Sequence, residues 1–515
     1  MKDRRTHFDK LNTLLFGKDL RITKGEQYKE EREFDYTSYY PVEKYIKPQA
    51  APERNVYRVT DFGAVPNDVK VDNAPMINAC IDACFKNGGG TVLVDGGDFT
   101  SRTVELKSGI TLFVEHGSSI IAHESGEGFS HKTLIYANGC KDITVTGGGT
   151  INGNGHLFGR EPLYPENLTE PDEVIDVIKM RRDYRAQLRF AHPSKYGRII
   201  SFEDCENLSF KNIILFDSAY WTCRLTRCNN ISFEDFVIND NRHVCNTDGI
   251  DLMQCSEVEI KHCFISCADD GIVLKNAIWE GCSGGMSNIY VTDCEIISCT
   301  NAFKIGTETT YPISDVLVEN CSFMMTDLYP GSVSGISIES VDGSEVFNIT
   351  ARNNTMNRCT CPLFIRLGNR NRAALVNEQS ATAVEFGVKP QGGGVDKNSF
   401  DFKGELHDVL IENITAKDIE LPVIIAGFKE KGRTKYVKNI TLKNISLEYR
   451  KAKEVYDKRS FIPEYAKQYP ECWRFRNLPA YAIWARHAEN ISVESFSCTP
   501  ARSTWKQSFI FDDVK

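Results

Sequence analysis

207-NLSFKNI-213 and 230-NISFEDF-236 are two copies of a short pattern that decides the fold of this 515-residue chain. Each copy begins with Asn or an acidic residue, alternates apolar with polar residues, and ends at Ile, Phe or Cys. The first apolar residue recurs after 23, 27, 31 and 27 residues between Leu208 and Val316. Further copies begin at Glu257, Asn288, Asp315, Asp408, Asn439 and Asn490. Such alternation indicates short strands with one buried face, and the recurrence has the length of one solenoid coil.

The recurrence also predicts how the strands pair. It is too short for a strand–helix–strand unit, so the strands of successive coils must stack in parallel, about 4.8 Å apart, with equivalent residues above one another. We therefore predict an all-β chain that forms a single-stranded right-handed parallel β-helix, a solenoid with an N-terminal capping helix and long loop insertions. The capping helix is expected from Asn73 to Phe85, with Asn73 as its N-cap and Gly88–Gly90 at its end.

Composition along the chain indicates the limits of the solenoid. Residues 1–50 precede the repeats and are rich in charge and tyrosine, so they are expected to form an N-terminal extension on the outside. The β-helix domain is expected to span residues 51–515. Charged or irregular stretches predict insertions at about residues 156–196, with helical character, and at residues 369–403.

The composition excludes several classes of function. Hydrophobic residues make up 41% and charged residues 25%, as in a soluble globular protein, and no apolar run approaches the roughly 20 residues of a membrane span. A net charge of −9 without an extended Lys/Arg run argues against nucleic-acid binding. The start, MKDRRTHFDK, has no apolar segment behind it, so a cytoplasmic location is expected, with secretion left open if a signal peptide has been removed.

The 18 cysteines do not suggest a disulfide framework. Cys263, Cys294 and Cys321 fall at the position where other copies of the repeat carry Ile or Phe, so they are interpreted as buried apolar side chains. Paired CxxC spacings with nearby histidines are missing, which argues against zinc. The N-I-S/T matches are interpreted as turns of the repeat, because Asn tolerates the left-handed region, and not as glycosylation sites. No metal and no cofactor is expected.

Two neighbouring coils carry the candidate chemistry. They contain Asn246-Thr247-Asp248-Gly249 and Ala268-Asp269-Asp270-Gly271, and Asp248 and Asp269 are separated by 21 residues, close to one coil. Stacking would bring three carboxylates together, and like charges at close range raise one another's pKa. Glycoside hydrolysis needs one carboxylic acid as proton donor and a second carboxylate as base or nucleophile. Asp-Gly turns and a calcium site are the structural alternatives for these residues.

At these residues the chain resembles glycoside hydrolase family 28, the polygalacturonase family, whose pattern is Asn-Thr-Asp followed about one coil later by Asp-Asp. The resemblance extends from Val59–Ala64, through Gly197–Phe202 and Tyr220-Trp221-Thr222, to at least Ile338. It implies a divergent member of the pectin lyase-like β-helix superfamily. It also implies that Asp269 is the general acid, that Asp248 and Asp270 hold the attacking water, and that the configuration is inverted.

The chain departs from the family pattern at two places. Where the family has Gly-His-Gly, this chain has 300-TNAFKIG-306, so the family's histidine corresponds to Asn301. Where the family's Arg-Ile-Lys should fall, the chain has Ser337-Ile338-Glu339. A bidentate Arg that holds a uronate carboxylate cannot be replaced by Ser without losing both hydrogen bonds. The substrate preference is therefore expected to differ from that of a standard endo-polygalacturonase.

Eight residues are candidates for substrate binding: Asn246, Lys275, Asn301, Lys304, Glu339, Arg366, Tyr220 and Trp221. For the three cations the alternative is a solvated charge. Glu339 can bind sugar hydroxyl groups or pair with Lys304 or Arg366. The two aromatic residues can stack on a sugar or pack in the protein.

These observations predict a glycosidase of polygalacturonase type with an oligosaccharide or polysaccharide substrate and no nucleic-acid or membrane partner. The substrates expected are pectin-derived oligosaccharides that contain galacturonate or rhamnogalacturonan, attacked in exo mode with inversion. A polysaccharide lyase of the same fold and a non-catalytic glycan-binding β-helix remain as alternatives. The sequence predicts neither the sugar linkage nor the oligomeric state.

Overall fold

The computed structural model describes residues 39–158, 196–241, 244, 246–324, 332–370, 372, 403–449, 462–475, 478–500 and 506–515. The predicted insertions at residues 156–196 and 369–403 lie largely outside this part of the chain, as do residues 1–38 of the predicted N-terminal extension.

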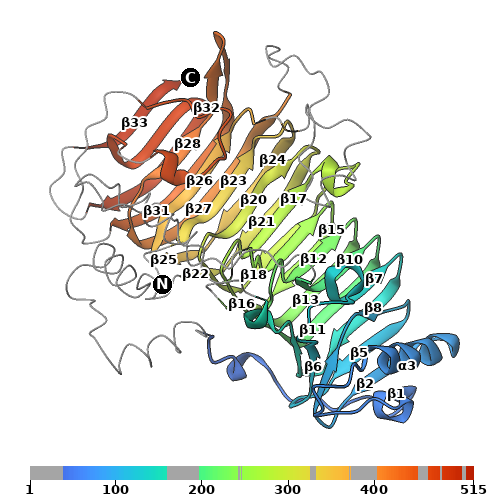
Figure 1. Ribbon diagram of the computed structural model, residues 1–515. Helices are drawn as coiled ribbons and strands as arrows, with labels where there is room; N and C mark the ends of the chain where they lie inside the picture. Colours follow the sequence, from blue (N-terminus) through green and yellow to red (C-terminus); the bar gives the residue numbers. More distant parts are fainter. Residues whose placement is uncertain are drawn as a thin grey trace, which may run out of the picture.

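One parallel sheet of 31 strands forms the body of the molecule. Successive strands pair with strands one coil away, and the pairings divide into three ladders, here called A, B and C. Figure 1 shows them as stacked rungs that rise from α3 (Ala74–Lys86) at the N-terminal end to β33 at the C-terminal end. The predicted right-handed parallel β-helix is confirmed. A two-stranded antiparallel hairpin, β29 (Phe428–Glu430) and β30 (Arg433–Lys435), projects from it.

Each ladder is defined by its strands. Ladder A contains β1 (Val56–Arg58), β2 (Gly90–Val94), β5 (Ile110–Val114), β8 (Lys141–Thr146), β11 (Glu206–Phe216), β13 (Asn229–Asn239), β15 (Ser256–Lys261), β18 (Ile289–Thr292), β21 (Ile313–Glu319), β24 (Glu345–Arg352), β27 (Glu405–Ile419) and β31 (Val437–Tyr449). Ladder B contains the second halves of β11, β13, β27 and β31, together with β3 (Asp98–Ser101), β6 (Ser119–Ala122), β9 (Thr150–Asn152), β16 (Phe264–Cys267), β19 (Glu295–Ser298), β22 (Ser322–Met324) and β25 (Thr355–Asn357). Ladder C contains β4 (Val104–Glu105), β7 (Thr133–Asn138), β10 (Arg198–Glu203), β12 (Cys223–Thr226), β14 (Ile250–Met253), β17 (Ile272–Asn276), β20 (Asn301–Thr309), β23 (Ser332–Ser340), β26 (Cys359–Leu367), β28 (Val423–Ala426), β32 (Ala480–Thr499), which continues into ladders A and B, and β33 (Gln507–Val514).

The core lies inside the coils and consists of columns of stacked apolar residues. In ladder C, Ile250, Ile272, Phe303, Ile336 and Leu363 are in register on five successive strands and are all buried. Each such side chain contributes roughly 1.5–3 kcal/mol through its burial. Because side chains alternate between faces, the residue after each of these points outward, and ladder C therefore presents a second column to its outer face.

The repeat's first residue forms a polar column on the outside. Asn207, Asn230, Asn288 and Asn439 all have φ between 55° and 59°, in the left-handed region that Asn tolerates. The side-chain amide of Asn230 donates to Asn207 at 2.8 Å, and those of Asn288 and Asn439 donate to the acidic residue one coil earlier. The structure thus confirms these residues as turns of the repeat.

Helix α3 lies across the N-terminal opening, where it contacts β1, β2, β4 and β5 and buries Ile77 and Ile81. The helix was predicted correctly and Asn73 is its N-cap residue, but the Asn73 side chain makes no capping hydrogen bond to the helix. That side chain accepts from Val65 N at 2.7 Å and donates to Thr100 O at 3.1 Å, so it joins the helix to the first coil. Within the described residues, no helix has the length and apolar character needed to cross a membrane.

The cysteines in the described residues are all free, and all but Cys140 and Cys498 are buried. Cys263, Cys294 and Cys321 lie in one column of the core, as their place in the repeat predicts.

Residues 39–50 lie against the outer face of ladder B. Ile46 packs with Val237, Phe264 and Ile297, and the ring of Tyr45 stacks on Phe264 at 4.4 Å. This apolar contact fixes the described part of the N-terminal segment on the solenoid. The boundary between an extension and the β-helix domain at residue 50 remains a prediction.

Candidate active site

The outer face of ladder C brings the three predicted carboxylates together. Ile250 pairs with Ile272, so Asp248, two residues before the first, stacks on Asp270. One carboxylate oxygen from each of Asp248, Asp269 and Asp270 lies within 4.8 Å of the other two. The register therefore aligns Asp248 with Asp270, while the 21-residue spacing had pointed to Asp269.

The glycines that follow these acids are explained by close stacking. A Cβ on Gly249 would lie 2.4 Å from the carbonyl oxygen of Gly271, and a Cβ on Gly271 would lie 2.5 Å from that of Ala302. Neither glycine has a positive φ. The Asp-Gly pairs are therefore strand entries that must pass close to the next coil, which removes the Asp-Gly turn as an explanation for them.

Asp248 is buried with one weak cationic contact. It is 3% exposed, its Oδ2 lies 3.4 Å from Lys275 Nζ, and its Oδ1 has no hydrogen-bond partner among the residues that the structure describes. Burial raises the pKa of Asp248 well above its ordinary value, and the neighbouring Asp251 raises it further, against the opposing effect of Lys275. A buried carboxyl in this setting favours the protonated form.

Asp251 is the buried partner that sequence reasoning missed. Lys275 Nζ lies 2.5 Å from its Oδ1, and burial raises the pKa of Asp251 to about 6 even though Lys275 lowers it. Burial disfavours the charge on Lys275, but Asp251 and Asp248 outweigh that effect and raise the pKa of the lysine. The alternation of Ile250 and Leu252 inward was the available signal, because it places Asp251 on the outer face.

Asp270 has the opposite electrostatics at nearly the same burial. Its Oδ1 accepts from Thr300 Oγ1 at 2.8 Å and from Asn301 Nδ2 at 2.7 Å, and its Oδ2 lies 3.0 Å from Lys304 Nζ. Burial raises the pKa of Asp270, but Lys304 and Asn301 outweigh burial and hold it below its ordinary value. Asn301, the predicted counterpart of the family's histidine, donates to Asp270 and so stabilises its charged form.

Asp269 is the member of the trio that solvent reaches, since Asp248 and Asp270 are both buried. Its Oδ1 lies 3.0 Å from Thr300 Oγ1 and also accepts from the backbone N–H of Asp270 at 3.1 Å. The three acids thus differ in solvent access, and Asp248 and Asp270 differ in the direction of their pKa shifts.

Glu339 and Arg366 are in register on β23 and β26, one coil apart as predicted. Glu339 is 1% exposed and accepts from Ser337 Oγ at 2.6 Å, and its burial raises its pKa to about 8. Arg366 is also buried, and its guanidinium donates to the carbonyl oxygens of Gly427 and Glu464, both at 2.6 Å. This arrangement favours a structural role for Arg366, and its role in binding stays a prediction.

The predicted aromatic pair lies beside the acids on the N-terminal side. The rings of Tyr220 and Trp221 stack at 5.1 Å, and Lys275 Nζ lies 3.8 Å from the centre of the Trp221 ring. Both aromatic residues are half-buried. Asn246 lies in the turn before Asp248 with a φ of 57°. The structure thus places Trp221 in contact with the lysine that serves Asp248.

A charged group from later coils extends the site, and sequence reasoning missed it. Glu308 lies 3.9 Å from Lys275 Nζ and 3.2 Å from Arg372 Nη2. Asp342 is buried and pairs with both Arg370 and Arg372. Acidic and basic side chains thus alternate from the acidic trio to Arg370 and Arg372. No sequence motif marks Glu308, Asp342 or the two arginines.

The acidic trio also has the donor set for a divalent cation, since carboxylate oxygens are the ligands that Ca²⁺ and Mg²⁺ prefer. Lys275 and Lys304 already bring positive charge to Asp248 and Asp270, so their side chains supply the neutralisation that a cation would otherwise provide.

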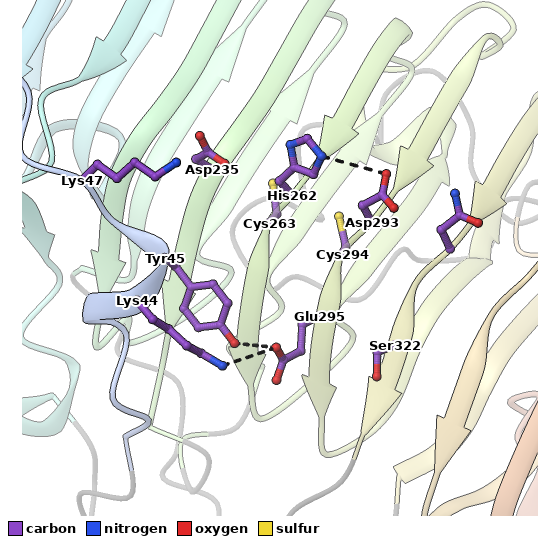
Figure 2. A pocket seen from close by; sticks show the side chains of 11 residues that line it. Lys44, Tyr45, Lys47, Asp235, His262, Cys263, Asp293, Cys294, Glu295 and Ser322 are labelled. Carbon is purple, nitrogen blue, oxygen red and sulfur yellow. Dashed lines mark hydrogen bonds and ion pairs between the residues drawn. The ribbon is translucent and has the colours of Figure 1, made fainter.

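A separate surface pocket of about 430 Å³ lies on another side of the solenoid. Figure 2 shows Tyr45 and Lys44 directed at Glu295, and His262 directed at Asp293. The Tyr45 hydroxyl lies 2.5 Å and Lys44 Nζ 3.9 Å from the Glu295 carboxylate, and His262 Nε2 lies 4.0 Å from Asp293. It lies where the N-terminal segment crosses the turns between ladders A and B. None of the predicted site residues lines it.

Comparison with known proteins decides the family. The model of "Glycosyl hydrolases family 28" matches residues 84–386, more than half of the chain, including all three acids. The chain belongs to this family.

Individual relatives are distant. A probable polygalacturonase of Arabidopsis thaliana is 24% identical over 64% of this chain, and the match spans 65% of that relative's length, just under two thirds. Among solved structures, the exopolygalacturonase of Thermotoga maritima has a TM-score of 0.59 at 19% identity, covering 88% of this chain and 95% of its own. The family 28 exopolygalacturonase of Yersinia enterocolitica has a TM-score of 0.57 at 17% identity, covering 91% and 78%. At these identities the structures support the fold.

Proposed function

We propose that this family 28 protein hydrolyses pectin-derived oligosaccharides that contain galacturonate. The observation that carries the proposal is the acidic trio, in which three carboxylates share one face while burial raises the pKa of Asp248 and Lys304 lowers that of Asp270. The pKa contrast supports the base role: Lys304 keeps Asp270 charged beside a buried carboxyl that favours its proton, and a general base must be deprotonated.

Asp269 is proposed as the general acid. It has solvent access, and Thr300 Oγ1 lies within hydrogen-bond distance of both Asp269 and Asp270. A hydroxyl has a single hydrogen. If Thr300 donates it to the charged Asp270, its oxygen can accept from a protonated Asp269. The geometry is therefore compatible with a proton on Asp269, ready for the leaving glycosidic oxygen.

Asp270 is proposed as the general base, because Lys304 and Asn301 stabilise its charged form. Asp248, which pairs with Lys275, would make the second contact to the attacking water. This assigns the water to the buried stack and the proton donor to the exposed edge, so the two roles reach the sugar from different sides.

The stereochemical outcome proposed is inversion, which rests on the family pattern. Inverting enzymes usually keep their carboxyl groups about 6.5–9.5 Å apart, and retaining ones about 5–5.5 Å. The nearest oxygens of this trio are within 4.8 Å, so spacing alone does not favour inversion. Proton NMR of the first product formed decides it, because inversion gives the β-anomer from an α-linked substrate and retention gives the α-anomer.

The substrate is proposed to be a uronate-containing oligosaccharide cleaved from its end. Lys275, Lys304 and Arg372 supply cations around the acids, although the family's Arg-Ile-Lys is replaced by Ser337-Ile338-Glu339. Exo action is supported by the names of the two solved exopolygalacturonases that share the fold. Galacturonate and rhamnogalacturonan oligosaccharides are the substrates to compare.

Incubation with oligogalacturonides of defined length tests the proposal. Exo hydrolysis releases one terminal unit per new reducing end and survives EDTA. Formation of an unsaturated product that absorbs in the ultraviolet, if EDTA prevented it, would indicate a lyase. Binding without any new reducing ends would indicate a glycan-binding protein.

A further inference from the structure

One exposed aromatic side chain beside the acids comes from outside the matched family region. Tyr469 precedes η8 (Cys472–Phe475), is 42% exposed, and lies beyond residue 386, where the family match ends. Its hydroxyl oxygen is 3.4 Å from Lys304 Nζ, and that nitrogen is 3.0 Å from Asp270. A single lysine therefore links Tyr469 to the proposed base.

The arrangement repeats that of Trp221 on the opposite side of the acids. Trp221 contacts Lys275, which binds Asp248, and it precedes β14 in the stack. Tyr469 contacts Lys304, which binds Asp270 and lies on β20, beyond β17. Two aromatic side chains, each against a buried lysine that serves one acid, thus flank the site of bond cleavage along the solenoid axis.

The environment of Tyr469 suits a surface that receives an anionic sugar. Lys304 Nζ lies 5.5 Å and the Arg370 guanidinium 5.4 Å from the centre of its ring. These cations hold the ring by cation–π attraction while two fifths of the residue stays open to solvent. A sugar whose apolar C–H face packs on that ring would place a carboxylate near the two positive charges.

We propose that Tyr469 is a specificity-determining residue that stacks on the uronate unit on the C-terminal side of the acids. This rests on the proposed function, since it assigns a binding role within the same site. Loss of the ring together with the area that it would bury on the sugar is expected to weaken binding about tenfold, which corresponds to about 1.4 kcal/mol.

The test compares Tyr469→Ala and Tyr469→Phe with Phe85→Ala as control. Phe85 is matched in exposure, at 45%, and in having a lysine, Lys107 Nζ, 5.5 Å from its ring, but it lies on the capping helix. Trigalacturonate binding is measured by calorimetry with each substitution in an Asp269→Asn background. Turnover is measured separately with each substitution in the otherwise unchanged protein, and thermal unfolding confirms folding.

The proposal expects Tyr469→Ala to weaken trigalacturonate binding and raise KM about tenfold, with a much smaller change in kcat. Tyr469→Phe keeps the ring and should lose much less affinity, and Phe85→Ala should leave binding as it was. Equal losses in the Ala and Phe variants, or a fall in kcat alone, would overturn stacking, because they would mean that the hydroxyl acts through Lys304. Binding of trigalacturonate without turnover in the unchanged protein would refute the proposed hydrolysis while leaving the stacking role open to the same comparison.

Discussion

Two stacks of buried aspartates lie on the described part of this solenoid, and one of them has the features of an active site. Asp217 and Asp240 directly follow β11 and β13 in register, just as Asp248 and Asp270 precede β14 and β17. Asp240 accepts from Thr222 Oγ1 at 2.5 Å and from the backbone N–H of Ser218 at 2.7 Å. Burial raises the pKa of Asp240 to about 8. Burial therefore favours the neutral form of Asp240 at pH 7, and neutral donors surround it.

The difference between the stacks lies in their cations and in solvent access. Among the described residues, Asp217 has His156 as its ion-pair partner, with Nδ1 2.6 Å from Oδ2. In the acidic trio, two buried lysines pair with Asp248 and Asp270, and the third acid reaches solvent. Stacked aspartates alone thus show that the surrounding coils can neutralise the charge of buried carboxyl groups. In the acidic trio, Lys304 keeps the carboxylate of Asp270 charged, while the partly exposed Asp269 beside it can hold a proton.

The sharpest way to break this comparison is to neutralise one acid in each stack. Asp269→Asn removes the proposed proton donor and keeps the shape, so kcat should fall about 10²–10⁴-fold. Asp240→Asn mimics the neutral acid already present and should leave turnover near that of the unchanged protein. Both are measured as new reducing ends from trigalacturonate. If the Asp240 variant lost as much activity as the Asp269 variant, the distinction between the two stacks would be wrong.

Removing a lysine tests what separates the stacks. Lys304→Met leaves Asp270 buried without its cation, so its pKa should rise. Because a base must be deprotonated, the acidic limb of the kcat/KM profile should move to higher pH, with a loss at neutral pH of about 10²-fold. Lys438→Met is the control, since that lysine pairs with Glu405 at 3.4 Å on the exposed surface.

An unshifted acidic limb in Lys304→Met, with the fold intact, would remove Asp270 from the role of base. Breaking a buried pair also costs about 3–5 kcal/mol of stability, so the thermal midpoint of unfolding is recorded for both variants.

How far the sequence predicts this molecule follows from what its repeat encodes. Alternation and a coil-length period predicted the parallel β-helix, because both follow from the backbone geometry of stacked strands. The same period placed Asp248 near Asp269 and Asp270. It missed the register by one residue because coil length varies, from 23 to 31 residues among the repeats compared, so spacing gives proximity without alignment.

Contacts between distant segments could not be predicted from the repeat. Tyr469 meets Lys304 across 165 residues, and it lies in no repeat and no motif. Arg366 was correctly placed one coil beyond Glu339, but its burial against the carbonyl groups of later segments was invisible in the sequence. Asn73 had the spacing of an N-cap, yet its side chain bonds to Val65 and Thr100 because the first coil lies close beside it.

The stacks should also differ in how pH affects stability. Asp240 has a pKa of about 8 in the folded protein against about 3.9 when unfolded. The folded state therefore binds more protons between those values, and stability falls as pH rises through that range. Asn at position 240 cannot ionise. Between pH 6 and pH 8, the unfolding free energy of Asp240→Asn should therefore fall by about 2 kcal/mol less than that of the unchanged protein. Denaturant melts at both pH values measure this, and parallel pH slopes for the two proteins would contradict a neutral Asp240.

The smallest effect is expected at the rim, where Arg372 is 34% exposed and its guanidinium lies 4.2 Å from the ring centre of Trp279. Arg372 already pairs with Glu308 and Asp342, so its positive charge would attract a bound uronate only weakly. Exposed ion pairs contribute roughly 0.2–1 kcal/mol, so Arg372→Gln should raise KM about threefold. A charge effect should be lost on methyl-esterified oligosaccharides, for which the variant and the unchanged protein should have similar KM values. Arg352→Gln is the control. It removes an exposed arginine that pairs with Glu319 on ladder A, and it should change KM for neither substrate. Equal losses on the acid and the ester would mean that Arg372 supports the shape of the site, and the lysines would then be the only cations left to distinguish the two stacks.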